Sequence, residues 1–566
     1  MCLQGMGVSG GIGIGRVVVL ENNAPDVIRK TAARGETARL AEAVTRLSAA
    51  LREKADSACG EQADILESHI MLLGDPIMQS EVEEIIHLQN CNSEYAVNEV
   101  FEKYAAAFEM SGNELLAARV SDLRDIKNNL LRALCCKDIF EVIEWPAGSV
   151  LVARELTASL SAGLNPENIC AFITQEGGKT SHTAIIARSL GLPAVAGISA
   201  HMLKSGDSVI VNGDTGEVIP EPSEEVLAQY IDRREDMARR NRELERLRGL
   251  ASRTADGRIV SLCANIGLEA DIQRAAHADA EGVGLFRTEF LYMNRNTAPA
   301  EEEQFIVYKK AAEAFCGKPV IIRTLDVGGD KDIPYLDLKK EENPFLGWRA
   351  IRYCLMRKEL FSAQLRAILR ASAFGNVKIM LPMITTATEF YKAKELIEQV
   401  KSELIEKNIA FNKKIAVGIM IETPSAAIMA DRLAEIADFF SIGTNDLTQY
   451  VMAVDRGNKN VAALYSTYDP AVLRLIYSVA QAAKTQGISC GVCGEAGADP
   501  LLTRFLIGSG IDELSMVGTS ILQIRKEVLS THYADVKEKI GKALPSLKTK
   551  EDSVRFLHSL SCLNAI

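Results

Sequence analysis

The chain has 566 residues, of which 47% are hydrophobic and only 6% aromatic, and its formal net charge is −11. At about 150 residues per domain, this length predicts several domains. The negative charge argues against a nucleic-acid-binding protein, which usually presents a basic face. No apolar run approaches the roughly 20 residues that span a bilayer, and the glycine-rich start lacks the basic and apolar segments of a secretory signal. We therefore expect a cytoplasmic protein with no nucleic-acid partner and no membrane insertion.

The first part of the sequence predicts a small α/β domain interrupted by a helical insertion. Strand-like apolar runs lie at 16–20, 149–153, 169–173, 208–212 and 217–219. The last two flank Gly213-Asp-Thr-Gly216, which predicts a hairpin. From Leu40 onward, apolar residues recur at helical spacing until about Leu134. We expect 1–20 and 145–222 to form one α/β domain, with 21–144 as an inserted helical bundle.

The second part predicts a charged linker helix over 223–255 and a barrel over 256–566, which completes an α/β multidomain architecture. Strand-like runs in the barrel region lie at 259–266, 282–290, 319–326, 377–384, 416–424, 439–447, 489–494 and 513–517. Helical patterns separate most of them, and repeated β-α units of this number are typical of a (β/α)8 TIM barrel. A doubly wound open sheet is the alternative, but its glycine fingerprint after the first strand is missing.

Polar residues interrupt the apolar runs near the C-terminal ends of the predicted strands, where barrels carry their active sites. In strand order they are Arg287, Arg323, Glu422, the pair Asn445-Asp446, and Cys493. Arginines offer bidentate donors to an anion such as phosphate, carboxylates are hard ligands of the kind Mg²⁺ takes, and an asparagine can bond a substrate oxygen. Any one Arg–Glu pair could equally be an ordinary salt bridge. The set as a whole predicts a site for a small phosphorylated acid and for phosphoryl transfer.

A second candidate centre surrounds His182 in the segment Gln175-Glu-Gly-Gly-Lys-Thr-Ser-His-Thr. A strand leads into a glycine turn, after which Thr180 and Ser181 can cap a helix that begins near His182. The positive end of a helix dipole favours an added phosphate. It also disfavours the imidazolium, so a neutral ring nitrogen is left free to attack. A single histidine is more often structural, but this context favours a chemical role.

With both centres in view, the sequence resembles the phosphoenolpyruvate-protein phosphotransferases, the enzyme I family of the bacterial sugar phosphotransferase system, along nearly its whole length. The motifs that carry the resemblance are Gly177-Gly-Lys-Thr-Ser-His-Thr, Gly284-Leu-Phe-Arg-Thr-Glu-Phe-Leu, Arg323-Thr-Leu-Asp-Val-Gly-Gly-Asp-Lys331, Asn343-Pro-Phe-Leu-Gly-Trp-Arg349, Ser441-Ile-Gly-Thr-Asn-Asp-Leu-Thr-Gln-Tyr450 and Cys493-Gly-Glu.

The resemblance implies a role for each matching position. His182 would be the phosphorylated residue of a swivelling domain, and Cys493 the acid that protonates the enolate as pyruvate forms. Glu422 and Asp446 would bind Mg²⁺. Phosphoenolpyruvate would be held by Arg287, Arg323, Arg349, Asn445 and Arg456. The family further implies docking of a small histidine-containing phosphocarrier protein on the helical insertion, where His69 and Arg124 fall in family-like segments without an assigned role, and a homodimer formed through the barrel.

Three segments depart from the family pattern, and three other functions compete with this one. The departures are Gly10 in place of a usual proline, Lys179 in place of a frequent arginine, and residues 496–499 after Cys493. A pyruvate phosphate dikinase or phosphoenolpyruvate synthase would need an ATP-binding domain, for which we find no segment. A catalytically silent scaffold that senses phosphoenolpyruvate would not need all of the predicted catalytic residues. A barrel aldolase or lyase would leave the histidine domain without a purpose.

Overall fold

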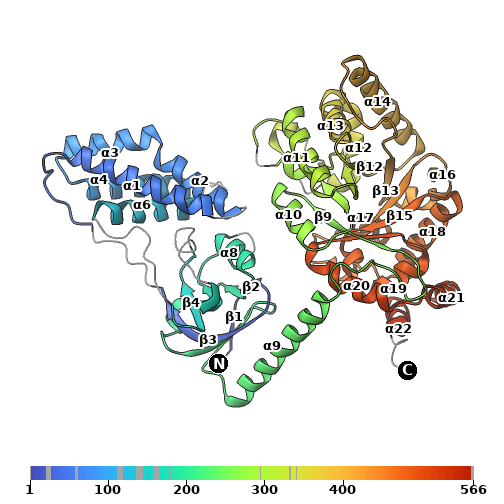
Figure 1. The fold of residues 1–566 in the computed structure, drawn as a ribbon, viewed down its shortest axis with the longest axis horizontal. Helices are drawn as coiled ribbons and strands as arrows, with labels where there is room; N and C mark the ends of the chain where they lie inside the picture. The colour runs from blue at the N-terminus through green and yellow to red at the C-terminus, as the bar shows by residue number, and fades with distance from the viewer. Residues whose placement is uncertain are drawn as a thin grey trace. The chain divides into compact units, whose positions relative to one another are not determined.

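The computed structural model describes residues 2–20, 27–57, 61–110, 119–135, 145–156, 166–178, 181–293, 295–329, 333–338 and 341–561. The chain divides into two compact units, Met1–Arg240 and Asn241–Ile566 (Figure 1). Each unit has its own hydrophobic cores. No helix in the described part of the chain is long and apolar enough to cross a membrane.

The first unit contains a mixed eight-stranded sheet in the order β1-β8-β7-β3-β4-β5-β6-β2. Its strands are β1 (Leu3–Gln4), β2 (Met6–Ser9), β3 (Ile12–Val19), β4 (Ser149–Ala153), β5 (Ile169–Thr174), β6 (Ala194–Ala196), β7 (Ser208–Asn212) and β8 (Glu217–Pro220). Strands β3 to β6 run parallel, and β7 and β8 form the expected antiparallel hairpin. Apolar side chains cover both faces of the sheet, and the helix α8 (His182–Leu190) packs on one of them through Ala184 and Ala187.

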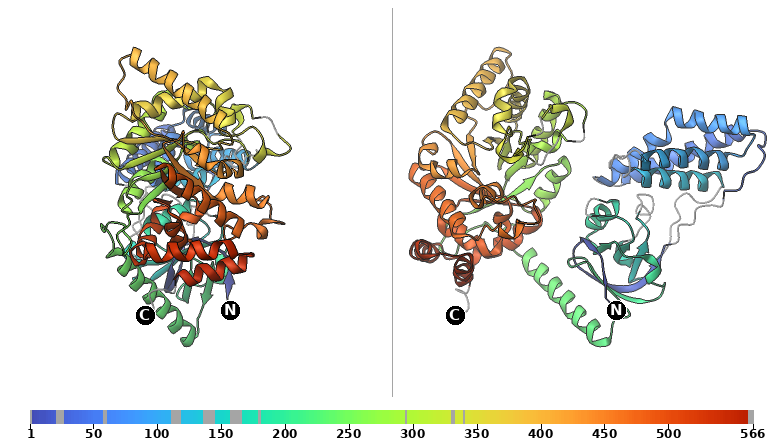
Figure 2. Two further views of the ribbon diagram at one scale, coloured as in Figure 1. Left: turned by 90° about the vertical axis from the view of Figure 1, so that its right-hand side faces the viewer. Right: turned by 180° about the vertical axis from the view of Figure 1, so that it is seen from behind.

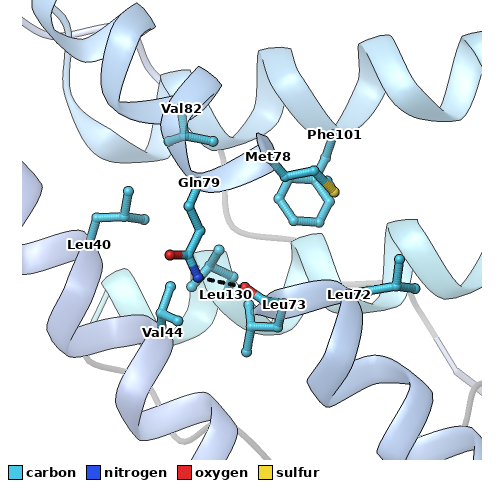
Figure 3. Close-up of a pocket in the computed structure, with 9 residues that line it drawn as sticks. All are labelled: Leu40, Val44, Leu72, Leu73, Met78, Gln79, Val82, Phe101 and Leu130. Carbon is cyan, nitrogen blue, oxygen red and sulfur yellow. Dashed lines mark hydrogen bonds between the residues drawn. The ribbon is translucent and has the colours of Figure 1, made fainter. Parts of the chain in front are cut away.

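Five described helices lie between β3 and β4 in the sequence, although these two strands are paired neighbours in the sheet. They are α1 (Glu36–Ser57), α2 (Glu61–Leu73), α3 (Pro76–Gln89), α4 (Ser93–Met110) and α6 (Val120–Leu134). Their buried faces form one core that includes Leu47, Val100 and Leu130. A cavity of about 20 Å³ in this core is lined mostly by apolar side chains, and Gln79 turns its amide to donate to the Leu73 carbonyl (Figure 3). The cavity is large enough for one water molecule and too small for a substrate.

The second unit is a closed barrel of eight parallel strands, as the sequence predicts, and the open-sheet alternative is wrong. The strands are β9 (Ser261–Ile266), β10 (Val283–Arg287), β11 (Pro319–Arg323), β12 (Asn376–Leu381), β13 (Val417–Ile421), β14 (Phe439–Gly443), β15 (Ser489–Cys493) and β16 (Glu513–Met516). Several end three or four residues earlier than expected. At β13 the reason is local, because Thr423 caps the next helix and Pro424 occupies its first position.

An outer layer of helices surrounds the barrel (Figures 1 and 2). They are α10 (Glu269–His277), α11 (Glu301–Ala314), α12 (Ile351–Met356), α13 (Lys358–Ala371), α14 (Ala387–Glu406), α15 (Pro424–Ile428), α16 (Ala430–Leu433), α17 (Thr444–Met452), α18 (Pro470–Gln486), α19 (Pro500–Ser509), α20 (Ile521–Ser530), α21 (Tyr533–Ala543) and α22 (Lys550–Ser561). A separate cluster fills the barrel interior and includes Met380, Met420 and Cys493. The charged helix expected before the barrel is α9 (Glu224–Glu245), in which Tyr230 is the buried residue.

Candidate active site

The polar residues singled out from the sequence gather at the C-terminal ends of the barrel strands. Arg287, Arg323 and Cys493 are the last residues of β10, β11 and β15. Glu422 follows β13 directly, and Asn445-Asp446 lie in the first turn of α17 after β14. Because parallel strands end at the same rim, residues that are up to 206 positions apart in the sequence meet in one place.

Two buried arginines are fixed by acidic side chains at this rim. Arg323 Nη2 donates to Glu289 Oε1 at 2.7 Å, and its Nη1 lies 3.1 Å from Asp326 Oδ2. The other oxygen of Asp326 accepts from Arg349 Nη2 at 3.0 Å. The side chains of Arg323, Arg349 and Asp326 are 8%, 4% and 3% exposed. One buried carboxylate therefore bridges two guanidinium groups and sets the spacing between them.

Arg349 is also held by its own backbone neighbourhood and by a tyrosine. The next residue, Ala350, has φ 50° and ψ −126°, a conformation that is strained for a residue with a side chain. Its amide donates to the Val327 carbonyl at 3.0 Å, which anchors the turn. Arg349 Nη1 donates to the Tyr450 hydroxyl at 3.2 Å. The guanidinium is thus positioned before any ligand arrives, which favours tight recognition of an anion.

The two candidate metal ligands face this pair of arginines. Asp446 Oδ2 accepts from Arg349 Nη2 at 3.1 Å, and Asp446 Oδ1 lies 3.5 Å from Arg456 Nη2. Glu422 is 2% exposed, and its Oε1 accepts from the Met383 amide at 2.6 Å. Burial raises the pKa of Glu422 well above its ordinary range, and the carboxylates of Asp446 and Asp326 act in the same direction. Acids crowded in this way gain stability when a cation binds among them.

Asn445 ties the loop after β15 to this rim. Its Oδ1 accepts from the Glu495 amide at 3.1 Å, and its Nδ2 donates to Glu495 Oε1 at 3.4 Å. The loop includes residues 496–499, where the sequence departs from the family pattern, and it forms a 3₁₀ turn over Glu495–Ala498. The departing residues therefore directly follow Glu495, which is hydrogen-bonded to Asn445.

Cys493 lies in the barrel interior directly below the charged rim. It is 2% exposed and packs with Met380 and Met420. Its Sγ accepts a hydrogen bond from the Ser441 hydroxyl at 3.3 Å and donates to the Ile442 carbonyl at 3.6 Å. Burial raises the pKa of the thiol to about 11, although Ser441 opposes this shift. The thiol is therefore protonated at neutral pH. This state suits a residue that donates a proton, whereas a nucleophilic cysteine would have to be a thiolate.

The second candidate centre is the start of α8. The helix begins at His182, and Ser181 caps it by accepting from the Ala184 amide at 3.4 Å, as expected. Gly177 has φ 115° in the preceding turn, and Ser181 closes that turn by donating to the Gly178 carbonyl. The side chain of His182, and all of Lys179 and Thr180, lie outside the described residues.

Comparison with known proteins places these centres in a family. The chain matches the PEP-binding domain of PEP-utilising enzymes over residues 241–533, their N-terminal domain over 4–119, and their mobile domain over 145–216. It is 44% identical to the phosphoenolpyruvate-protein phosphotransferase of Geobacillus stearothermophilus over 98% of this chain and 97% of that protein. It is 42% identical to the enzyme of the same name from Bacillus subtilis, over 98% and 99% of the two chains. The chain belongs to the phosphoenolpyruvate-protein phosphotransferase family.

The phosphoenolpyruvate-protein phosphotransferase of Haemophilus influenzae is 41% identical over 94% of this chain and 95% of that protein. As a member of this family, the chain is an enzyme, and the family requires a divalent metal. Among the described residues, no group of three or more His, Cys, Asp and Glu side chains forms a metal site. Glu422 and Asp446 nevertheless fit a hard cation whose remaining ligands are water and substrate oxygens.

Several residues that shape the rim belong to the sequence motifs, although the family resemblance implies no role for them. Asp326 ends the run Arg323-Thr-Leu-Asp, Glu289 follows Arg287 by two positions, and Tyr450 ends the motif that begins at Ser441. For Asp326 and Glu289, the available signal in the sequence was an assigned arginine two or three positions away. Their function as partners depends on contacts between strands, which no local pattern reveals.

Outside the barrel, the two family-like positions of the helical insertion have structural partners. His69 is 1% exposed, and its Nε2 lies 3.1 Å from Asp122 Oδ1. Arg124 donates to Glu109 at 2.9 Å. His69 is therefore a buried, hydrogen-bonded residue of the helical core, and we assign it no chemistry.

Proposed function

We propose that the chain transfers the phosphoryl group of phosphoenolpyruvate to its own His182, releases pyruvate, and passes the phosphate to a histidine of a small phosphocarrier protein. This would be the first step of sugar uptake by the phosphotransferase system. The observation that carries the proposal is the pair of buried arginines, Arg323 and Arg349, fixed by Asp326 beside the carboxylates Glu422 and Asp446. That arrangement suits a ligand with several negative oxygens.

In the proposed complex, Arg323 and Arg349 bind the phosphate, and Arg287, Asn445 and Arg456 complete the site around the substrate. Glu422 and Asp446 would hold Mg²⁺, which would supply positive charge to the phosphoryl transfer. Asp446 is ion-paired with Arg349 in this structure. Arg349 also keeps its bond to Asp326, so it can exchange Asp446 for a phosphate oxygen without losing its position.

The chemical step is an in-line displacement at phosphorus. A neutral ring nitrogen of His182 attacks, the bond from phosphorus to the enol oxygen breaks, and its electron pair stays on the leaving enolate. The protonated thiol of Cys493 then gives its proton to the methylene carbon, so that pyruvate forms. Because His182 is the first residue of α8, the free backbone N–H groups and the positive end of the helix dipole would favour a phosphate on this residue.

Delivery of the phosphate requires His182 to reach the barrel and the carrier protein at different times. We propose that a swing of the α/β domain about the α9 linker provides this movement, and that it can limit turnover. The carrier would dock on the helical insertion, and the barrel would form a homodimer.

The nine cysteines among the described residues are all free thiols, which supports a cytoplasmic, reducing location.

The experiment that tests the proposal is labelling with ³²P-phosphoenolpyruvate and Mg²⁺, comparing the native chain with His182→Ala. We expect an acid-labile, alkali-stable label on the native chain alone. Absence of label on a native chain that still binds phosphoenolpyruvate would overturn the proposal and favour a scaffold that senses this compound.

A further inference from the structure

Ser441 stands out because it is a buried hydroxyl whose partner is the candidate acid. Ser441 is 1% exposed and belongs to β14, which pairs in parallel with β15. In this register Ser441 lies opposite Gly491, which has no side chain, and Gly443 lies opposite Cys493. The serine side chain therefore reaches diagonally along the interior face to the sulfur two positions farther on.

In this hydrogen bond Ser441 is the donor, so the serine does not bind the proton that Cys493 would give away. The Ser441 hydroxyl donates to Sγ at 3.3 Å, whereas the thiol itself donates toward the Ile442 carbonyl at 3.6 Å. Within the described part of the chain, the contact with Cys493 is the one hydrogen bond that the Ser441 side chain makes. The S–H bond can rotate from Ile442 toward a substrate while the serine stays in place.

We propose that Ser441 is a positioning residue that stabilises the thiolate of Cys493 when this cysteine protonates the enolate. The inference rests on the proposed function and adds a residue to it. In this step the S–H bond breaks with its electron pair left on sulfur, and the proton forms the third C–H bond of the pyruvate methyl group. The Ser441 hydroxyl then donates to a full negative charge instead of a neutral sulfur.

The surroundings of the sulfur make such a donor necessary. The apolar side chains that pack in one cluster with Cys493 are Leu285, Ile321, Met380, Met420 and Phe439, and they offer a new anion no strong hydrogen bond. The charged groups that act on the thiol from the rim are Glu422, which disfavours the thiolate, and Arg323 and Arg287, which favour it. Both arginines also serve the substrate in the proposed complex. A donor reserved for the sulfur keeps the thiolate stabilised while the arginines are engaged.

A hydrogen bond to a charged group contributes about 1.5–3 kcal/mol, and 1.36 kcal/mol corresponds to a factor of ten in rate. Ser441→Ala should therefore lower kcat for pyruvate formation about 10- to 150-fold while the KM for phosphoenolpyruvate stays unchanged. Ser441→Thr retains the hydroxyl and should recover most of kcat. A serine that only filled space would alter KM or the melting temperature and would not be rescued through its hydroxyl.

The deciding experiment is a double-mutant cycle in the full-length chain, with Ser441→Ala, Cys493→Ala and the double variant measured for pyruvate formation. If the serine acts through the sulfur, the double variant should equal Cys493→Ala alone. Independent, multiplying losses would overturn the inference, as would a native kcat in Ser441→Ala. Label from phosphoenolpyruvate on native His182 is measured in parallel. Its absence would refute the proposed function itself, whereas a labelled native chain with multiplying losses would refute the role of Ser441 alone.

Discussion

Removal of the charge on Asp326 should weaken the binding of phosphoenolpyruvate, because Asp326 positions the two arginines of the proposed substrate site. Its two oxygens contact Arg323 and Arg349, and all three side chains are buried. Asp326→Asn keeps the size of the side chain, but only one of its two polar atoms can still accept from an arginine. The other atom is an amide donor that faces a guanidinium.

The expected magnitude follows from the loss of one charge-assisted contact. Such a contact contributes about 1.5–3 kcal/mol, which corresponds to a loss of about 10- to 150-fold in kcat/KM for phosphoenolpyruvate. The assay is the initial rate of His182 phosphorylation as a function of phosphoenolpyruvate concentration. Circular dichroism melting of the same samples shows whether the barrel still folds.

A matched control exists on the outer helices of the barrel. Glu301 also bridges two arginines, with Arg366 Nε at 2.7 Å and Arg370 Nη1 at 2.8 Å. Glu301→Gln removes the same kind of bridge from a more exposed place, so it should leave kcat/KM near the native value. Native kcat/KM in Asp326→Asn, or an equal loss in both variants, would refute the view that Asp326 positions the arginines.

Three further predictions concern strain, pH and metal. Ala350→Gly should raise the free energy of unfolding of the barrel by about 1 kcal/mol. Glycine relieves backbone strain of about 1–3 kcal/mol, which exceeds the free-energy cost of a more flexible unfolded chain. A lower melting temperature in calorimetry would contradict this. Burial raises the pKa of Asp256, but hydrogen bonds from Thr254 and from the Tyr533 and Ala534 amides outweigh it and hold the pKa well below its ordinary value. The carboxylate therefore stabilises the barrel above the ordinary aspartate pKa, and this stabilisation is lost as pH falls below it. Urea titrations should show that Asp256→Asn lowers the free energy of unfolding by about 0.5–1.5 kcal/mol at pH 7, and that the difference from the native chain narrows from pH 4 toward pH 2. A difference that does not depend on pH would argue against this role of the carboxylate. Chelation of divalent ions should abolish labelling by phosphoenolpyruvate and added Mg²⁺ should restore it, while persistent labelling in the chelator would show that the metal is dispensable.

The sequence predicts the barrel and the position of its site because both depend on local patterns. Strand-length apolar runs alternate with helical periodicity, and the polar residue that ends each run shows where the rim lies. The predicted strands extend too far where a rim residue already belongs to the next element. The predicted strand 439–447, for example, extends four residues into helix α17 (Thr444–Met452), where the polar residues Thr444, Asn445 and Asp446 already form the first helical turn.

The contacts within the site could not be predicted in the same way. Arg349 and Asp446 are separated by 97 positions, and Ser441 and Cys493 by 52. Their distances depend on the closure of the barrel and on the register of β14 against β15. Sequence patterns specify which side chains reach the rim, whereas the bridging role of Asp326 and the partner of Cys493 follow only from the packed structure.

The central claim, that the phosphate of phosphoenolpyruvate moves to His182 as pyruvate forms, is tested most directly by a single turnover followed by rapid quenching. Pyruvate is quantified, and the phosphorylated peptide is located by mass spectrometry under alkaline conditions. The account predicts one phosphate on His182 for each pyruvate released. Pyruvate formed without a phosphorylated peptide, or a phosphate on any other residue, would contradict it.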